Sequence, residues 1–148
     1  MKNNFENNNT GKKVITIAKE WLGKNFNPDE TEQCCYFVRH IYFLAGKKLG
    51  VTKKPSDNFF PTGTGYANSL AGDDIGIKIN KISDLCEGDL VFFKNTYGNW
   101  PDGTITHVGI YSGEGEFIHR TTTSLPVEKQ KLSEYHGGKK FLEGRRII

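Results

Sequence analysis

The chain has 148 residues, 36% of them hydrophobic and 25% charged, which is the size and composition of one ordinary globular domain. A formal net charge of +3 is too small to indicate nucleic acid as a partner. Three cysteines, two of them adjacent, do not form a disulfide framework. The sequence also has no apolar run as long as a membrane span, and its N-terminus has no apolar core of the length of a secretory signal. From the low net charge we expect no nucleic-acid partner, and from the lack of a long apolar run we expect no membrane partner.

The N-terminal part of the chain predicts a tail and two helices. Residues 1–13 are polar and rich in Asn and Lys, so we expect a disordered tail there and a single domain over residues 14–148. Apolar residues recur at helical spacing over residues 14–22. They do so again from about residue 32 to residue 45, where Thr31 is the expected N-cap.

The second helical pattern carries two thiols near its start. Cys34 lies on the apolar face in the first turn, in phase with Phe37 and Val38. Cys35 is rotated from it by about 100° and shares its side with Arg39, so we expect it to point toward a more polar surface.

The rest of the chain predicts strands. A loop over residues 50–74, rich in Gly, Pro and aromatic residues, is long enough to suggest a binding segment. Short β-type runs follow, and the last two flank a hairpin signal at residues 112–115. These runs cover residues 75–79, 89–93, 107–111 and 116–120. Helices followed by short antiparallel strands predict an α+β fold, with the N-terminal helices packed on an antiparallel sheet.

One cysteine and two histidines could form a nucleophilic site. A thiolate attacks carbonyl groups, and a helix N-terminus and a neighbouring imidazole both favour the thiolate. Cys34 has the first by position, His107 could take the thiol proton, and His119 could hold the imidazole. The two histidines oppose each other if the hairpin is symmetric about Gly113, and Gly109 would then leave room for the helix with Cys34.

Structural roles account for isolated residues of these types. A cysteine on an apolar helix face is most often a small buried hydrophobe, and a strand histidine is most often satisfied in the core. We assign such roles to Cys86, His40 and His136. The cysteines and histidines lack the C-x-x-C or H-x-x-x-H spacing of a metal site, so we expect neither metal nor cofactor.

Four motifs in order resemble the NlpC-type family of papain-like cysteine peptidases, bacterial and phage hydrolases that cut peptidoglycan. They are Gln33-Cys34-Cys35-Tyr36-Phe37-Val38, Gly88-Asp89-Leu90-Val91-Phe92-Phe93, His107-Val108-Gly109-Ile110-Tyr111-Ser112-Gly113 and Phe117-Ile118-His119. The resemblance implies a papain-like fold with Cys34 as nucleophile, His107 as general base and His119 as the residue that orients it. It also implies cleavage of the peptide stem through a thioester, with the bond between D-Glu and diaminopimelate favoured.

Two departures from the family pattern bear on the site. Gln33 and Cys35 replace the usual Asp and Ser, which makes Cys35 a rival nucleophile, although helical phase favours Cys34. The Gln-Cys pattern is also similar to the related CHAP family. We expect the Cys34 backbone N–H, supported by Gln33, to stabilise an oxyanion, and Tyr66 and Trp100 to contact substrate.

Other functions use the same residues. Cleavage of the N-acetylmuramoyl-L-alanine bond is the enzymatic alternative, acyl transfer would use the same thiol, and a non-catalytic module could bind the cell wall or a protein. In each hydrolytic case the expected partner is peptidoglycan or a muropeptide, bound by a monomer. We expect the chain to be cytoplasmic as synthesised. Delivery to a cell wall by phage or a secretion system, a role in recycling peptides in the cytoplasm, and a leader that has been removed are the alternatives that the sequence leaves open.

Overall fold

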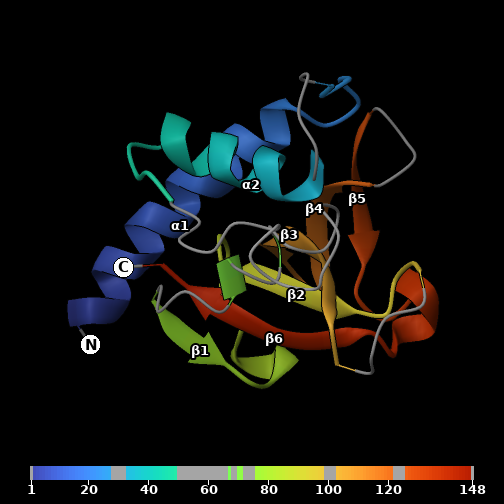
Figure 1. The fold of residues 1–148 in the computed structure, drawn as a ribbon. Helices are drawn as coiled ribbons and strands as arrows, with labels where there is room; N and C mark the ends of the chain where they lie inside the picture. Colours follow the sequence, from blue (N-terminus) through green and yellow to red (C-terminus); the bar gives the residue numbers. More distant parts are fainter. Residues whose placement is uncertain are drawn as a thin grey trace.

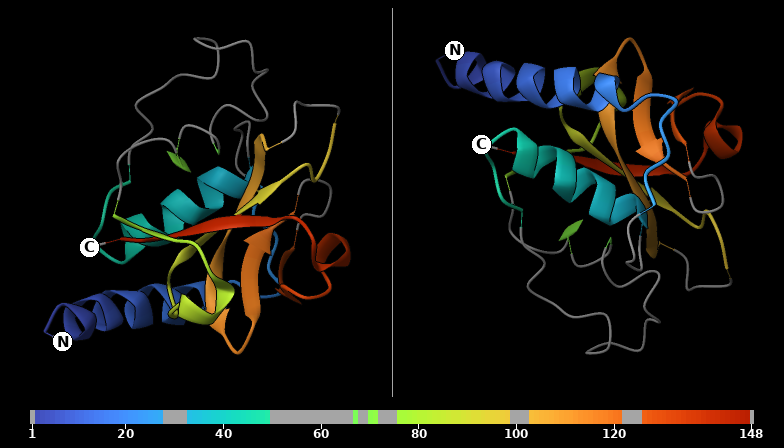
Figure 2. Two further views of the ribbon diagram at one scale, coloured as in Figure 1. Left: turned by 90° about the horizontal axis from the view of Figure 1, so that it is seen from below. Right: turned by 90° about the horizontal axis from the view of Figure 1, so that it is seen from above.

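The computed structural model describes residues 2–27, 33–49, 67, 70–71, 76–98, 103–121 and 126–147. Within these ranges, helices α1 (Lys2–Glu20) and α2 (Gln33–Leu44) cover one face of an antiparallel sheet (Figure 1). The two helices lie side by side and run in opposite directions (Figure 2). No helix in the described ranges is long and apolar enough to cross a membrane.

The sheet has six strands in the order β1-β6-β2-β3-β4-β5, and every neighbouring pair is antiparallel. The last strand of the chain returns to lie between the first two, while β2 to β5 follow one another across the sheet. The bounds are β1 (Ile77–Ile79), β2 (Leu90–Lys94), β3 (Ile105–Gly113), β4 (Glu116–Arg120), β5 (Val127–Lys131) and β6 (Phe141–Arg146), with short 3₁₀ turns η2 (Ile82–Asp84) and η3 (Tyr135–Gly138). The predicted α+β fold, with helices on an antiparallel sheet, is confirmed.

Apolar side chains cover both faces of the sheet. Because successive residues of a strand point to opposite faces, Leu90 and Phe92 join the core beneath the helices, while Val91 and Phe93 join a second, smaller core on the far face. Every residue of β3 except the last is buried. Polar side chains on this central strand are therefore shielded from water.

Helix α1 begins earlier than the sequence predicts. We expected a disordered tail over residues 1–13, whereas the structure is helical from Lys2. The backbone of α1 approaches the turn before β2 closely at Gly11. A Cβ added to Gly11 would lie only 2.0 Å from the carbonyl oxygen of Glu87. Glycine at position 11 thus lets α1 rest directly on the turn at residues 87–88, which periodicity alone does not reveal.

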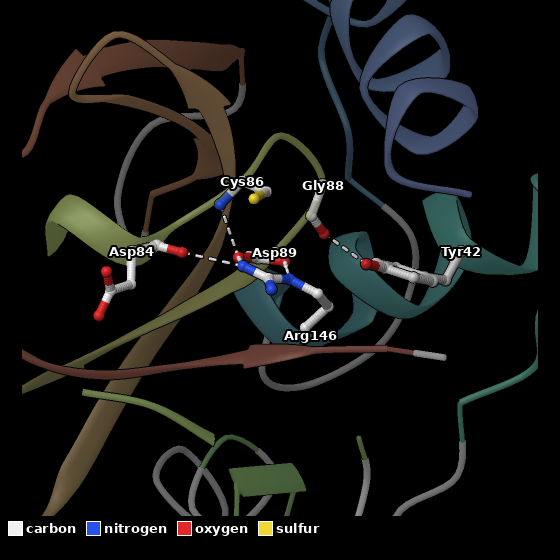
Figure 3. Close-up of polar contacts among 6 residues, drawn as sticks. All are labelled: Tyr42, Asp84, Cys86, Gly88, Asp89 and Arg146. Carbon is white, nitrogen blue, oxygen red and sulfur yellow. Dashed lines mark hydrogen bonds and ion pairs between the residues drawn. The ribbon is translucent and has the colours of Figure 1, made fainter. Parts of the chain in front are cut away.

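The Gly-Asp motif before β2 is a structural anchor. Asp89, which is 2% exposed, accepts hydrogen bonds from Arg146 Nε at 3.1 Å and Nη2 at 3.0 Å, and from the Cys86 backbone N–H at 2.7 Å (Figure 3). The hydroxyl of Tyr42 on α2 donates to the carbonyl of Gly88. These contacts tie β6 and α2 to the start of β2.

Candidate active site

His107 on β3 and His119 on β4 lie side by side on one face of the sheet, where Phe93 packs on His107 and Phe117 packs on His119. Their rings share a hydrogen bond, with 2.7 Å between His107 Nε2 and His119 Nδ1. The side chains are 1% and 0% exposed, so the pair is shielded from water. The structure therefore brings together two residues that the sequence predicted for one site.

The register of the hairpin differs from the expected one. A pairing symmetric about Gly113 would place His107 directly opposite His119, but the structure pairs Ile110 with Ile118 and shifts register between Tyr111 and the turn. The two histidines are therefore diagonal neighbours. They still share a face, because an offset of two residues preserves the side on which a strand residue points.

Gly109 has a different role from the one we expected. A Cβ at this position would lie 2.8 Å from Phe117 Cδ2 and 3.1 Å from the Cβ of His119. The glycine thus makes room for the neighbouring strand, rather than for the helix that carries Cys34. It does so because the shifted register places His119 across from Gly109.

Gln130 on β5 extends the histidine pair, and sequence reasoning did not single it out. β5 pairs with β4 so that Gln130 is opposite Phe117, one step diagonal from His119 and on the same face. His119 Nε2–H donates to Gln130 Oε1 at 2.5 Å. At the other end of this chain of hydrogen bonds, His107 Nδ1 is buried and has no hydrogen-bond partner among the residues that the structure describes. The polar pattern of residues 127–131 predicted nothing about this contact, because the register between strands creates it.

Burial sets the charge state of the two histidines. Burial lowers the pKa of His107 well below its ordinary value, and the nearby His119 and His136 lower it further. Burial also lowers the pKa of His119 to about 4, although the hydrogen bond that His119 donates to Gln130 acts in the opposite direction. Both imidazoles are therefore neutral near pH 7, which is the form that can accept a proton.

Tyr135 in η3 covers the histidine pair. Its ring centroid lies 5.7 Å from that of His107 and 5.3 Å from that of His119. Phe93 and Phe117 pack against the same ring. Aromatic side chains therefore surround the His107–His119 pair on several sides and exclude water from it.

Cys34 approaches this group from the first turn of α2. The helix packs against β3 and β4, and the Cys34 side chain is 6% exposed. Burial raises the pKa of Tyr135, and the charge of a Cys34 thiolate raises it further. Cys34 therefore lies within electrostatic reach of the ring that packs on both histidines.

Arg120 is a buried cation near the same thiol. It is 3% exposed, and its Nε donates to the carbonyl of Phe26 at 2.6 Å. Burial lowers the pKa of Arg120, whereas interaction with Cys34 raises it. A guanidinium near a thiol favours the thiolate, so the surroundings of Cys34 suit a nucleophile.

Comparison with known proteins decides the family. The model of the NlpC/P60 family matches residues 20–146, which is most of the chain. The chain belongs to the NlpC/P60 family. The resemblance that the four motifs predicted is thereby confirmed.

Relatives within the NlpC/P60 family cover nearly all of the chain. A probable endopeptidase NlpC homolog of Haemophilus influenzae is 36% identical over 141 residues, which are 93% of this chain and 63% of that protein. A gamma-D-glutamyl-L-lysine dipeptidyl-peptidase of Bacillus cereus is 30% identical over 141 residues, 90% of this chain and 35% of that protein. The chain thus spans less than two thirds of the length of these relatives.

A solved structure supports the fold. An NlpC/P60 family protein from Bacillus cereus superposes with a TM-score of 0.66 at 21% identity, covering 93% of this chain and 40% of that one. At this identity the likeness shows the papain-like NlpC/P60 fold alone.

Cys35 and His136 differ from their expected settings in this NlpC/P60 chain. We expected Cys35 to point toward a polar surface, but it is 1% exposed and lies in the core. It is buried because α2 packs against α1 as well as against the sheet. We placed His136 outside the site, but its ring lies 4.6 Å from that of Tyr135, and its charge lowers the pKa of both buried histidines. The return of the chain between β5 and β6 brings it there.

Of the remaining predicted residues, the structure describes Gln33 alone. Gln33 opens α2 beside Cys34 and is partly buried. Thr31, Tyr66 and Trp100 lie outside the described residues. Within the described part of the chain, no group of three His, Cys, Asp or Glu side chains could hold a metal ion.

Proposed function

We propose that the chain is a cysteine peptidase that hydrolyses an amide bond in the peptide stem of peptidoglycan. One observation carries the proposal. Among the described residues, the buried His107–His119 pair leaves His107 Nδ1 without a hydrogen-bond partner, and the charge of Cys34 acts on the Tyr135 ring that packs against both histidines. Nucleophilic catalysis by cysteine requires a thiol and an imidazole that can take its proton.

In the proposed mechanism, His107 Nδ1 takes the proton of the Cys34 thiol as the sulfur attacks the carbonyl carbon. The oxyanion of the resulting tetrahedral intermediate accepts hydrogen bonds from the Cys34 backbone N–H and from a donor on Gln33. The C–N bond then breaks, and the His107 imidazolium gives its proton to the leaving amine. Water, deprotonated by His107, attacks the thioester and releases the carboxylic acid and the thiol.

His119 acts in this scheme through His107. Its hydrogen bond to His107 Nε2 holds the base in one orientation and disperses positive charge on the imidazolium. Arg120 stabilises the negative charge that forms on the Cys34 sulfur as the thiol loses its proton. Each group thus stabilises one charge that forms during the reaction.

Support for the substrate comes from the relatives. The Bacillus cereus relative is named as a gamma-D-glutamyl-L-lysine dipeptidyl-peptidase, and the Haemophilus influenzae relative as a probable endopeptidase. We propose the bond between D-Glu and the third residue of the stem, diaminopimelate in the favoured case. Tyr66 and Trp100 remain our proposed substrate contacts.

Digestion of purified peptidoglycan tests the function. The wild-type chain should release soluble fragments, and Cys34→Ala should lower the rate by roughly 10³-fold or more, since loss of a covalent nucleophile leaves only residual catalysis. Cys86→Ala, which removes a partly exposed thiol from the turn before β2, is the matched control and should keep the wild-type rate.

The outcomes separate the alternatives. Equal release by wild type and Cys34→Ala would rule out Cys34 as nucleophile, and loss of release only in Cys35→Ala would assign the reaction to Cys35. Mass spectrometry of the fragments identifies the bond, because new termini at D-Glu and diaminopimelate indicate an endopeptidase, whereas a free N-terminal L-Ala indicates an amidase. Binding to peptidoglycan without any release would indicate a non-catalytic module.

A further inference from the structure

We propose that Gln130 is a positioning residue that fixes the tautomers of both buried histidines and so keeps His107 Nδ1 unprotonated. The inference rests on the proposed function in that His107 Nδ1 is the atom that takes the thiol proton. Its structural basis is the continuous row of hydrogen bonds from His107 through His119 to Gln130.

The direction of the row follows from its last member. A carboxamide oxygen can only accept, so His119 Nε2 must carry the proton that it donates to Gln130 Oε1. A neutral imidazole has one N–H, so His119 Nδ1 is then an acceptor. The hydrogen bond between the rings must therefore come from His107 Nε2–H, which leaves the lone pair on His107 Nδ1.

The burial of His107 Nδ1 supports the same direction. If Gln130 presented its NH₂ group instead, every donor in the row would reverse, and His107 Nδ1 would carry a proton. That N–H would be buried with no acceptor among the described residues, and unpaired buried donors are rarer than unpaired acceptors. In the observed arrangement His107 Nδ1 carries an unpaired lone pair rather than a proton. This lone pair can take a proton from a thiol.

The chemistry of a neutral amide also suits the site. Gln130 is partly exposed and adds no charge beside the pair, while its hydrogen bond raises the pKa of His119 against the effect of burial. When His107 becomes an imidazolium, the same row disperses its charge toward Gln130. Loss of the acceptor would weaken a hydrogen bond to a group that becomes charged, which corresponds to a roughly 10- to 100-fold change in rate.

Imidazole ¹⁵N NMR on the full chain reads the tautomers directly, without any substrate. In the wild-type chain near neutral pH, both histidines should be protonated at Nε2 and unprotonated at Nδ1. Gln130→Met, which keeps the length of the side chain but lacks an acceptor, should give a mixture of tautomers at both rings. Gln130→Glu, which keeps an acceptor, should retain the wild-type tautomers.

Kinetics on a soluble muropeptide provide the second measurement. Gln130→Met should lower kcat roughly 10- to 100-fold with little change in KM, because Gln130 acts on the base and not on substrate. Gln130→Glu should keep most of kcat and move the acid limb of the pH profile to higher pH, since a carboxylate raises the pKa of a nearby imidazole. Lys131→Met, exposed on the same strand, is the matched control. Urea unfolding of each variant separates a change at the site from a loss of fold.

The results distinguish this inference from the proposed function. A proton on His107 Nδ1 in the wild-type chain, or wild-type tautomers and kcat in Gln130→Met, would overturn the role of Gln130. Expected tautomers in a chain that releases no fragments would overturn the proposed function and leave the assignment of the tautomers standing.

Discussion

Acid should destabilise the fold through the buried histidine pair. Burial lowers the pKa of His119 to about 4, while a histidine in the unfolded chain titrates near 6.5. Between these values the unfolded chain binds a proton that the folded chain does not, so the free energy of unfolding falls as the pH falls. The slope is about 1.4 kcal/mol per pH unit for one proton, and the full difference for His119 is roughly 3 kcal/mol. This contribution is complete above about pH 6.5 and lost by about pH 4.

Urea unfolding between about pH 7.5 and about pH 4.5 measures the effect. Between about pH 6.5 and about pH 4.5, we expect the wild-type free energy of unfolding to fall more steeply than that of His119→Asn, by about 1.4 kcal/mol per pH unit, because Asn does not titrate. His107, whose pKa burial also lowers, continues to contribute in both proteins. Parallel lines for wild type and His119→Asn would refute the reasoning.

Two further substitutions test the packing around the site. Asp89→Asn should lower the free energy of unfolding by about 3 kcal/mol, because it leaves the Arg146 guanidinium without its carboxylate partner. Urea unfolding measures the loss, and a value under about 1 kcal/mol would contradict this expectation. Gly109→Ala should cost about 1–3 kcal/mol and lower fragment release further, because the new Cβ would lie 2.8 Å from Phe117 Cδ2 and push β4 away. The control is Ser112→Ala on the same strand, because the buried Ser112 hydroxyl has no hydrogen-bond partner in the described part of the chain. This variant should change stability by less than about 1 kcal/mol.

Local patterns in the sequence determined the elements and the main candidates. Helical periodicity placed Cys34 in the first turn of α2, on its buried face. Alternation placed His107 and His119 on paired strands, because the period of a strand is a property of a few consecutive residues. The four motifs together predicted the family, which the match over residues 20–146 confirms.

Only the tertiary structure decided what lies around those candidates. Gln130 reaches His119 because β5 pairs with β4 in one register, and a shift of one residue would turn its side chain to the other face. Tyr135 covers both histidines because the chain folds back between β5 and β6. Cys35 is buried because a second helix covers α2. Periodicity fixes where a side chain points on its own element, but burial and hydrogen-bond partners depend on elements that are distant in the chain.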